Sequence, residues 1–173
     1  MIPAAAVVPL LVFTVLAAGW DVRTRRIPNA LTISGLAVGL GLRALAGGAA
    51  LLDGVLGAGV MFVVLVPLFA MGGVGGGDVK LLIAVGAFLG LKGAMIGLLA
   101  TAVFGGVMAV FYSVRRGVIL PALLNTSGLL KHVLTFGRMG ERTTRPAAGA
   151  VSVPYGVAVA AGALFTLWYG GIA

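Results

Sequence analysis

Residues 79–114 form an apolar stretch that is too long for a single membrane-crossing helix, and this limits the possible folds more than any other feature. The stretch carries only two charged residues, Lys80 and Lys92. As one helix it would be about 54 Å long at ~1.5 Å per residue, against a bilayer hydrocarbon core of ~30 Å. The stretch must therefore reverse direction, and residues 90–93, GLKG, are the natural turn.

The composition favours lipid as the surrounding solvent. The chain has 173 residues, of which 61% are hydrophobic and 9% charged, and its mean hydropathy is +1.18. A soluble domain with so few charges could not cover this much apolar surface. We therefore predict an all-α membrane protein, one polytopic domain over residues 1–173, with about six transmembrane helices. The expected spans are 2–20, 30–47, 54–71, 79–91, 93–113 and 151–171.

Cysteine and histidine usage excludes several kinds of site. The sequence has no cysteine and one histidine, His132. A disulfide framework, a thiolate metal site and a cysteine nucleophile are therefore impossible. The single histidine argues against a multi-histidine metal centre, and no serine has a plausible partner except this distant residue. We expect neither a metal nor a cofactor.

The basic residues predict the orientation in the membrane. With six spans, alternate connections lie on one side, and ten of the 12 basic residues fall there, against Arg43 and Lys92 on the other. Lys and Arg accumulate in cytoplasmic connections, so we expect this side in the cytoplasm and both termini outside. The net charge of +8 is thus explained mostly by the orientation of the chain in the membrane. No nucleic-acid partner is expected, because no basic platform interleaved with aromatics is present. The ten residues are Arg23, Arg25, Arg26, Lys80, Arg115, Arg116, Lys131, Arg138, Arg142 and Arg145.

Two of the four acidic residues, Asp21 and Asp78, fall at cytoplasmic ends of predicted spans. Asp53 is expected on the outer side. Ionisable groups near membrane depth usually face a protein interior or a wet cavity. Simpler interpretations exist for each alone: Asp78 suits a helix N-cap, and Asp21 suits a solvated cluster with the neighbouring arginines. The glycines in 72–77, GGVGGG, favour more than a cap, since glycine admits close backbone approach. The pattern predicts a water-accessible pocket that admits another peptide backbone.

Two sequence blocks resemble the signatures of the type IV prepilin peptidases, which are GxGD intramembrane aspartyl proteases. The blocks are DVRTRRIPN at 21–29 and GGGDVK at 75–80, and VPYG at 153–156 is similar to an element of shorter members. The resemblance runs from the first span to the last. It implies that Asp21 and Asp78 are a catalytic dyad. One carboxylate would take a proton from water and the other, protonated, would donate to the scissile carbonyl, because two such close charges cannot both ionise.

The residues around the dyad have less defined roles. Lys80 is interpreted as tuning the dyad, binding a main-chain carbonyl or extending to the membrane interface. Pro28 and Asn29 are interpreted structurally, with proline fixing the backbone and asparagine capping the second helix. Tyr155 either lines the cleft or anchors at the interface. The predicted substrate-binding or active-site loop residues are Gly75, Gly77, Lys80, Pro28, Asn29 and Tyr155.

Residues 114–150 are predicted to form a cytoplasmic basic loop. Within it, SGLLKHVLTF at 127–136 places its apolar side chains on one helical face, which predicts a short helix on the inner membrane surface. His132 then belongs to the polar face. Anionic membrane lipid is the expected partner of these charges.

The resemblance implies a short-form prepilin peptidase of the kind found in tight-adherence pilus systems, in the bacterial inner membrane with its site facing the cytoplasm. It would cleave the leader from a prepilin or pseudopilin substrate, and other pilus-assembly proteins are possible partners. Longer members carry an amino-terminal extension, often with zinc-type cysteines, and N-methylate the product. Because the first span begins close to Met1 and there is no cysteine, we expect cleavage without methylation.

Two alternatives remain at this point. The first is a non-enzymatic six-span transporter or pilus-assembly membrane component, for which internal repeats or midplane charges would be typical and are not found. The second is a presenilin-like or signal-peptide-peptidase relative, which also has a GxGD block. The Pro-Ala-Leu stretch of this chain, at 121–123, lies in the predicted loop and far from the last helix.

Overall fold

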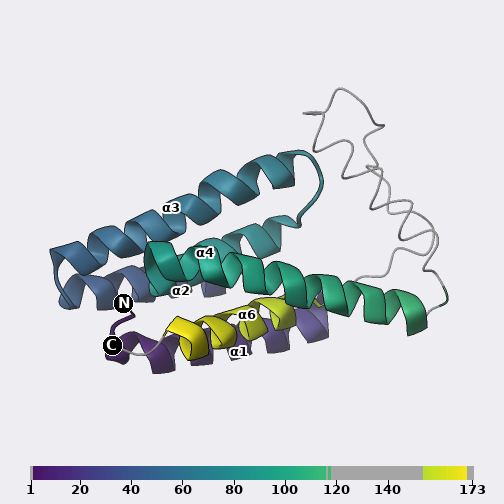
Figure 1. The fold of residues 1–173 in the computed structure, drawn as a ribbon, viewed down its shortest axis with the longest axis horizontal. Coiled ribbons are helices and arrows are strands. Elements are labelled where there is room, and N and C mark those ends of the chain that lie inside the picture. The colour runs from purple at the N-terminus through teal and green to yellow at the C-terminus, as the bar shows by residue number, and fades with distance from the viewer. Residues whose placement is uncertain (1, 116, 118–153, 171–173) are drawn as a thin grey trace.

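The computed structural model describes residues 2–115, 117 and 154–170. Its elements over these residues are all helices, as predicted. The predicted surface helix at 127–136 and nearly all of the basic loop lie outside the described residues. The helices, shown in Figure 1, are α1 (Ala4–Thr24), α2 (Asn29–Leu45), α3 (Gly48–Ala70), α4 (Gly76–Arg115) and α6 (Tyr155–Gly170).

The element α4 consists of two helices that meet at Gly90. The backbone there has φ 74° and ψ 178°, a combination that is essentially restricted to glycine. The second half returns beside the first (Figure 1). Gly105 lies against the ring of Tyr155, which shares a cavity with Asp78 at the start of the first half. A straight helix would separate residues 78 and 105 by about 40 Å. The predicted reversal at 90–93 is therefore confirmed.

Two predicted helix boundaries are wrong in ways that matter. The helix α3 begins at Gly48 rather than near residue 54, so Asp53 lies within a helix and not in a connection. The helix α4 begins at Gly76, which places Asp78 in its first turn. By length and apolar character α1, α3 and α4 are able to cross a membrane, and α2 and α6 are shorter apolar helices. The number of spans stays a prediction.

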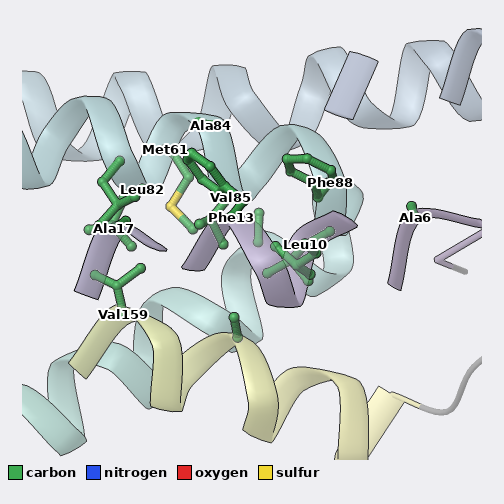
Figure 2. Close-up of a cluster of buried hydrophobic side chains, with 14 of the residues drawn as sticks. Ala6, Leu10, Phe13, Ala17, Met61, Leu82, Ala84, Val85, Phe88 and Val159 are labelled. Carbon is green, nitrogen blue, oxygen red and sulfur yellow. The ribbon is translucent and has the colours of Figure 1, made fainter. Parts of the chain in front are cut away.

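The first half of α4 forms the centre of the bundle. A helix that is apolar on all sides is stable in this position because every face can be covered. The helices α1, α2, α3 and α6 all contact α4. Figure 2 shows the resulting core, in which Phe13 of α1 stacks on Phe88 with ring centroids 5.9 Å apart. The buried residues of this half include Val79, Leu81, Leu82, Ala84, Val85, Ala87, Phe88 and Leu89.

The outer surface of the bundle is also apolar. Large hydrophobic side chains are exposed on α1, α2, α3, the second half of α4 and α6. An apolar surface of this extent fits contact with lipid rather than water. Examples are Val8, Val15, Val63, Leu99, Val107 and Trp168.

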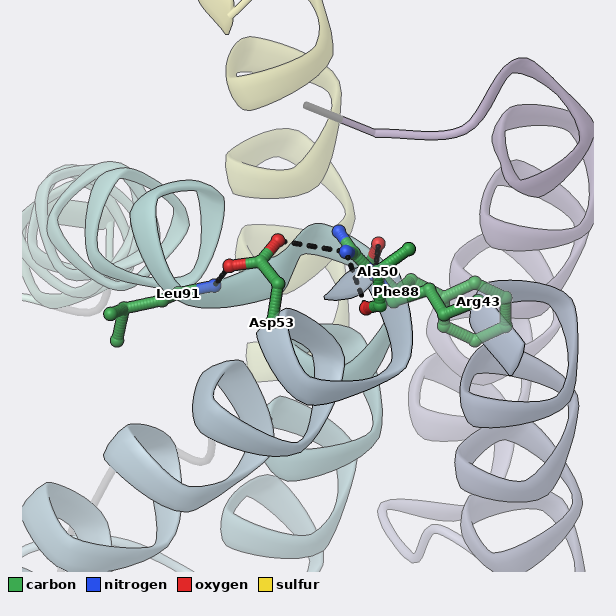
Figure 3. Close-up of polar contacts among 5 residues, drawn as sticks. All are labelled: Arg43, Ala50, Asp53, Phe88 and Leu91. Atoms are coloured by element: carbon green, nitrogen blue, oxygen red, sulfur yellow. Dashed lines mark hydrogen bonds and ion pairs between the residues drawn. The ribbon is translucent and has the colours of Figure 1, made fainter. Parts of the chain in front are cut away.

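A buried polar cluster holds the reversal at Gly90 (Figure 3). Arg43 is fully buried near the end of α2, and its Nη1 pairs with the Asp53 carboxylate at 2.8 Å. Arg43 Nε donates to the carbonyl of Phe88 at 3.1 Å, and the Leu91 N–H donates to Asp53 at 3.0 Å. A buried guanidinium requires such acceptors. The cluster thus joins α2, α3 and both halves of α4, and the sequence did not predict it.

We predict that Gly90→Ala lowers the free energy of unfolding by about 2 kcal/mol, because a side chain at this backbone conformation costs ~1–3 kcal/mol. The added Cβ would also collide with the Asp53 carboxylate. Unfolding in detergent micelles measures the change.

Gly106 provides the matched control within the same element. It is helical and exposed, and an added Cβ meets nothing within 4 Å. Gly106→Ala should therefore leave stability unchanged or raise it by up to ~1 kcal/mol, since glycine is unfavourable inside helices. Equal stability of the two variants would contradict the role of Gly90.

Candidate active site

Asp21 lies in the last turn of α1 and is only 7% exposed. Its Oδ2 accepts a hydrogen bond of 2.8 Å from the backbone N–H of Gly156. Gly156 is the second residue of α6, and the first N–H groups of a helix have no acceptor within the helix. The start of α6 therefore supplies a donor that orients the Asp21 carboxylate.

Asp78 is the third residue of α4 and is partly buried. The N–H of Val79 donates to the carbonyl of Gly75 at 3.1 Å, so Gly75 is the N-cap. The Asp78 carboxylate is hydrogen-bonded back to the Gly75 backbone, which is the side-chain half of a capping box. The interpretation of Asp78 itself as the N-cap is therefore wrong, although its side chain does stabilise the helix start.

Asp21 and Asp78 line the same cavity, whose volume is about 460 Å³. The two carboxyl groups reach this cavity from the end of α1 and the start of α4. A cavity of this size holds several water molecules, each of which occupies ~30 Å³ in the liquid. Two carboxyl groups in one site can divide the roles of acid and base. The other lining residues are Arg25, Arg26, Ile27, Gly75, Gly76, Gly77 and Tyr155.

Three of the predicted loop residues, Gly75, Gly77 and Tyr155, line this cavity. The Tyr155 ring packs on Gly105, where an added Cβ would lie 2.5 Å from its Cε2. This position supports the interpretation of Tyr155 as a cavity residue. The ring is partly buried and packs against the second half of α4. This packing fixes the start of α6 beside Asp21.

The other three, Pro28, Asn29 and Lys80, lie outside the cavity lining. Pro28 is the N-cap of α2 and no side chain caps the helix, so the prediction that Asn29 caps it is wrong. Lys80 Nζ instead donates to Asn29 Oδ1 at 2.9 Å. The bond joins the first sequence block to the second. Lys80 therefore binds a side-chain amide and not a main-chain carbonyl.

Gly156 is the site residue that the sequence analysis missed. It is the last residue of the VPYG stretch, so the signal was present. The stretch did not reveal that a backbone N–H, rather than the tyrosine side chain, contacts Asp21. As for metals, the described residues contain no group of three or more His, Cys, Asp or Glu side chains.

The fold and the cavity define a helical membrane protein with two carboxyl groups at one end of its bundle. Residues 8–110 match the model of the type IV leader peptidase family. This match spans more than half of the chain, and the chain belongs to that family. Neither a curated protein nor a solved structure gave a significant match. The matched range includes Asp21 and Asp78 but ends before Tyr155.

We predict that Gly156→Ala lowers peptidase activity by roughly tenfold to 100-fold, because small misplacements of catalytic groups cost this much. The added Cβ would lie 3.0 Å from the Asp21 Cβ and 3.3 Å from the backbone of Ala18, so the start of α6 must move.

The matched control is Gly170→Ala at the other end of α6, where an added Cβ meets nothing within 4 Å. It should keep wild-type activity. Accumulation in the membrane and the unfolding midpoint are compared for both variants, so that a folding defect is separated from a catalytic one. Wild-type activity of Gly156→Ala would remove Gly156 from the site.

Proposed function

We propose that this protein is an aspartic endopeptidase that cleaves the leader peptide from type IV prepilins or pilin-like precursors. The observation that carries the proposal is that Asp21 and Asp78 line one cavity, although they come from helices far apart in the sequence. Membership of the type IV leader peptidase family supports the substrate class. Paired carboxyl groups supply the acid and the base that hydrolysis of a peptide bond requires.

The mechanism uses the two carboxyl groups as a coupled pair. A water held between them loses a proton to the ionised carboxylate, and its oxygen attacks the scissile carbonyl carbon. The protonated carboxyl donates its proton to the carbonyl oxygen, which gives a tetrahedral diol. Proton transfer to the amide nitrogen then allows the C–N bond to break, and the dyad returns to its starting protonation. The backbone donors at Gly156 and Gly75 hold the two carboxyl groups in place for these transfers.

The arrangement of charge supports a cytoplasmic site in the bacterial inner membrane. The cavity lies at the end of the bundle where α1 ends and the first half of α4 begins, and its lining includes Arg25 and Arg26. Arg43 and Lys92 lie at the opposite end, beside the reversal of α4. Basic residues are retained on the cytoplasmic side. A precursor could thus keep its apolar segment in the bilayer while its leader junction enters the cavity.

We predict that Asp21→Asn and Asp78→Asn each lower cleavage at least ~100-fold, because an amide can serve neither as the base nor as the acid. The measurement is co-expression with candidate prepilins, followed by the ratio of cleaved to intact pilin. Both variants should accumulate at normal levels.

Glu141→Gln is the matched acid-to-amide control, because Glu141 belongs to neither sequence block. It should cleave like the wild type. Near-normal cleavage by either aspartate variant would exclude that residue from the dyad, and failure of the wild type on every prepilin would refute the proposed substrate class.

We also predict that the product keeps an unmethylated amino terminus. The sequence has no cysteine with which to build a cysteine-ligated zinc site. The purified chain is incubated with precursor and a methyl donor, and the mass of the mature pilin is measured by mass spectrometry. A mass increase equal to one methyl group would overturn this part of the proposal and leave the cleavage intact.

A further inference from the structure

A second cavity lies between α2 and the first half of α4, outside the cavity that holds the aspartates. Its volume is about 290 Å³. We propose that this groove binds the apolar segment that follows the cleavage site in the precursor. The inference rests on the proposed function and adds the surface that selects the substrate. The lining residues are Asn29, Thr32, Ile33, Leu36, Lys80 and Ile83.

The groove is polar at one end and apolar along its length. Asn29 and Lys80 lie near the starts of α2 and α4, and both helices start at the end of the bundle that holds the aspartate cavity. The remaining α2 residues follow at helical spacing on one face. The hydroxyl of Thr32 donates to the carbonyl of Asn29 at 3.0 Å, so its polar atom is already paired. An apolar chain can therefore lie along the groove without burying an unpaired polar group.

The groove adjoins the aspartate cavity, because the same two chain segments line both. Ile27 faces the cavity and Asn29 faces the groove two residues later. On the second segment Gly77 lines the cavity, and Lys80, about one helical turn further on and on the same side of α4, lines the groove. The segments touch where the Cβ position of Gly77 lies 3.7 Å from Ile27. An extended peptide advances ~3.3 Å per residue, so a few residues carry it from the dyad into the groove.

This continuity favours a peptide occupant over a free lipid chain. A substrate whose scissile bond lies in the cavity lined by Asp21 and Asp78 would pass the Lys80–Asn29 pair with the residues that follow. Ile33 is 66% exposed, so its side chain is accessible to a helix that lies in the bilayer. Van der Waals packing drives such helix contacts in lipid. The occupant is thus the apolar segment of the substrate itself.

The test fills the groove with a larger side chain. Ile33→Trp should raise the KM for a full precursor about tenfold with kcat nearly unchanged, because binding is lost equally in the ground and transition states. Val38→Trp is the matched control, since Val38 is a β-branched residue on the same helix that is 46% exposed and does not line the groove. It should leave both constants as in the wild type. An unchanged KM in Ile33→Trp overturns the proposal.

A second measurement does not depend on turnover. A benzophenone side chain is placed at position 33 or 38 in the Asp78→Asn background, and the precursor is added in vesicles. Crosslinking from position 33, but not 38, to the apolar segment of the precursor is expected. Equal crosslinking from both positions, or lipid adducts alone at position 33, overturns the proposal. Failure of the wild type to cleave the precursor would refute the proposed function instead, so the two failures are distinguishable.

Discussion

The reversal of α4 at Gly90 is the constraint on which the rest of the structure depends. From Leu81 to Gly90 the first half of α4 is buried except at Ile83, which is partly exposed, so this half occupies the centre of the bundle. The second half can then return along it, meet Tyr155 and bring the start of α6 to Asp21. The Arg43–Asp53 pair stabilises this turn at the end of the bundle opposite Asp21 and Asp78. A charge buried there is tolerated because the Asp53 carboxylate and the carbonyls of Ala50 and Phe88 accept hydrogen bonds from its Nη1 and Nε.

The candidate site is assembled from three helix ends. Asp21 comes from the end of α1, Asp78 from the start of α4, and the donor to Asp21 from the start of α6. Helix starts present unpaired N–H groups and a partial positive charge. The starts of α4 and α6 face the two carboxyl groups. Their N–H groups and partial positive charge offset part of the free-energy cost of placing two acids in one site near lipid. The glycine at 156 is small enough for this approach, since a Cβ there would press on Asp21.

The sequence predicted the helices and the place of the reversal, because apolar length and glycine position are local properties. It also brought Asp21 and Asp78 to one end of the bundle through the pattern of spans. The sequence predicted the helix boundaries and caps less accurately. Asp53 was expected on the outer side, just before a span at 54–71, whereas it lies within α3, where its carboxylate pairs with buried Arg43. Asn29 was predicted as a cap because of its residue type, but Pro28 takes that position and Asn29 binds Lys80.

By itself, then, the sequence determined an all-α chain of apolar helices, a forced reversal in 79–114 and two acids at one end of the bundle. Hydrophobic length and backbone sterics are sufficient for these conclusions. Only the tertiary structure decided which groups meet: Gly156 with Asp21, Lys80 with Asn29, and Arg43 with Asp53. Each of these contacts joins two different helices. Its existence depends on the rotation and depth of both helices, and packing around the centre of the bundle sets these.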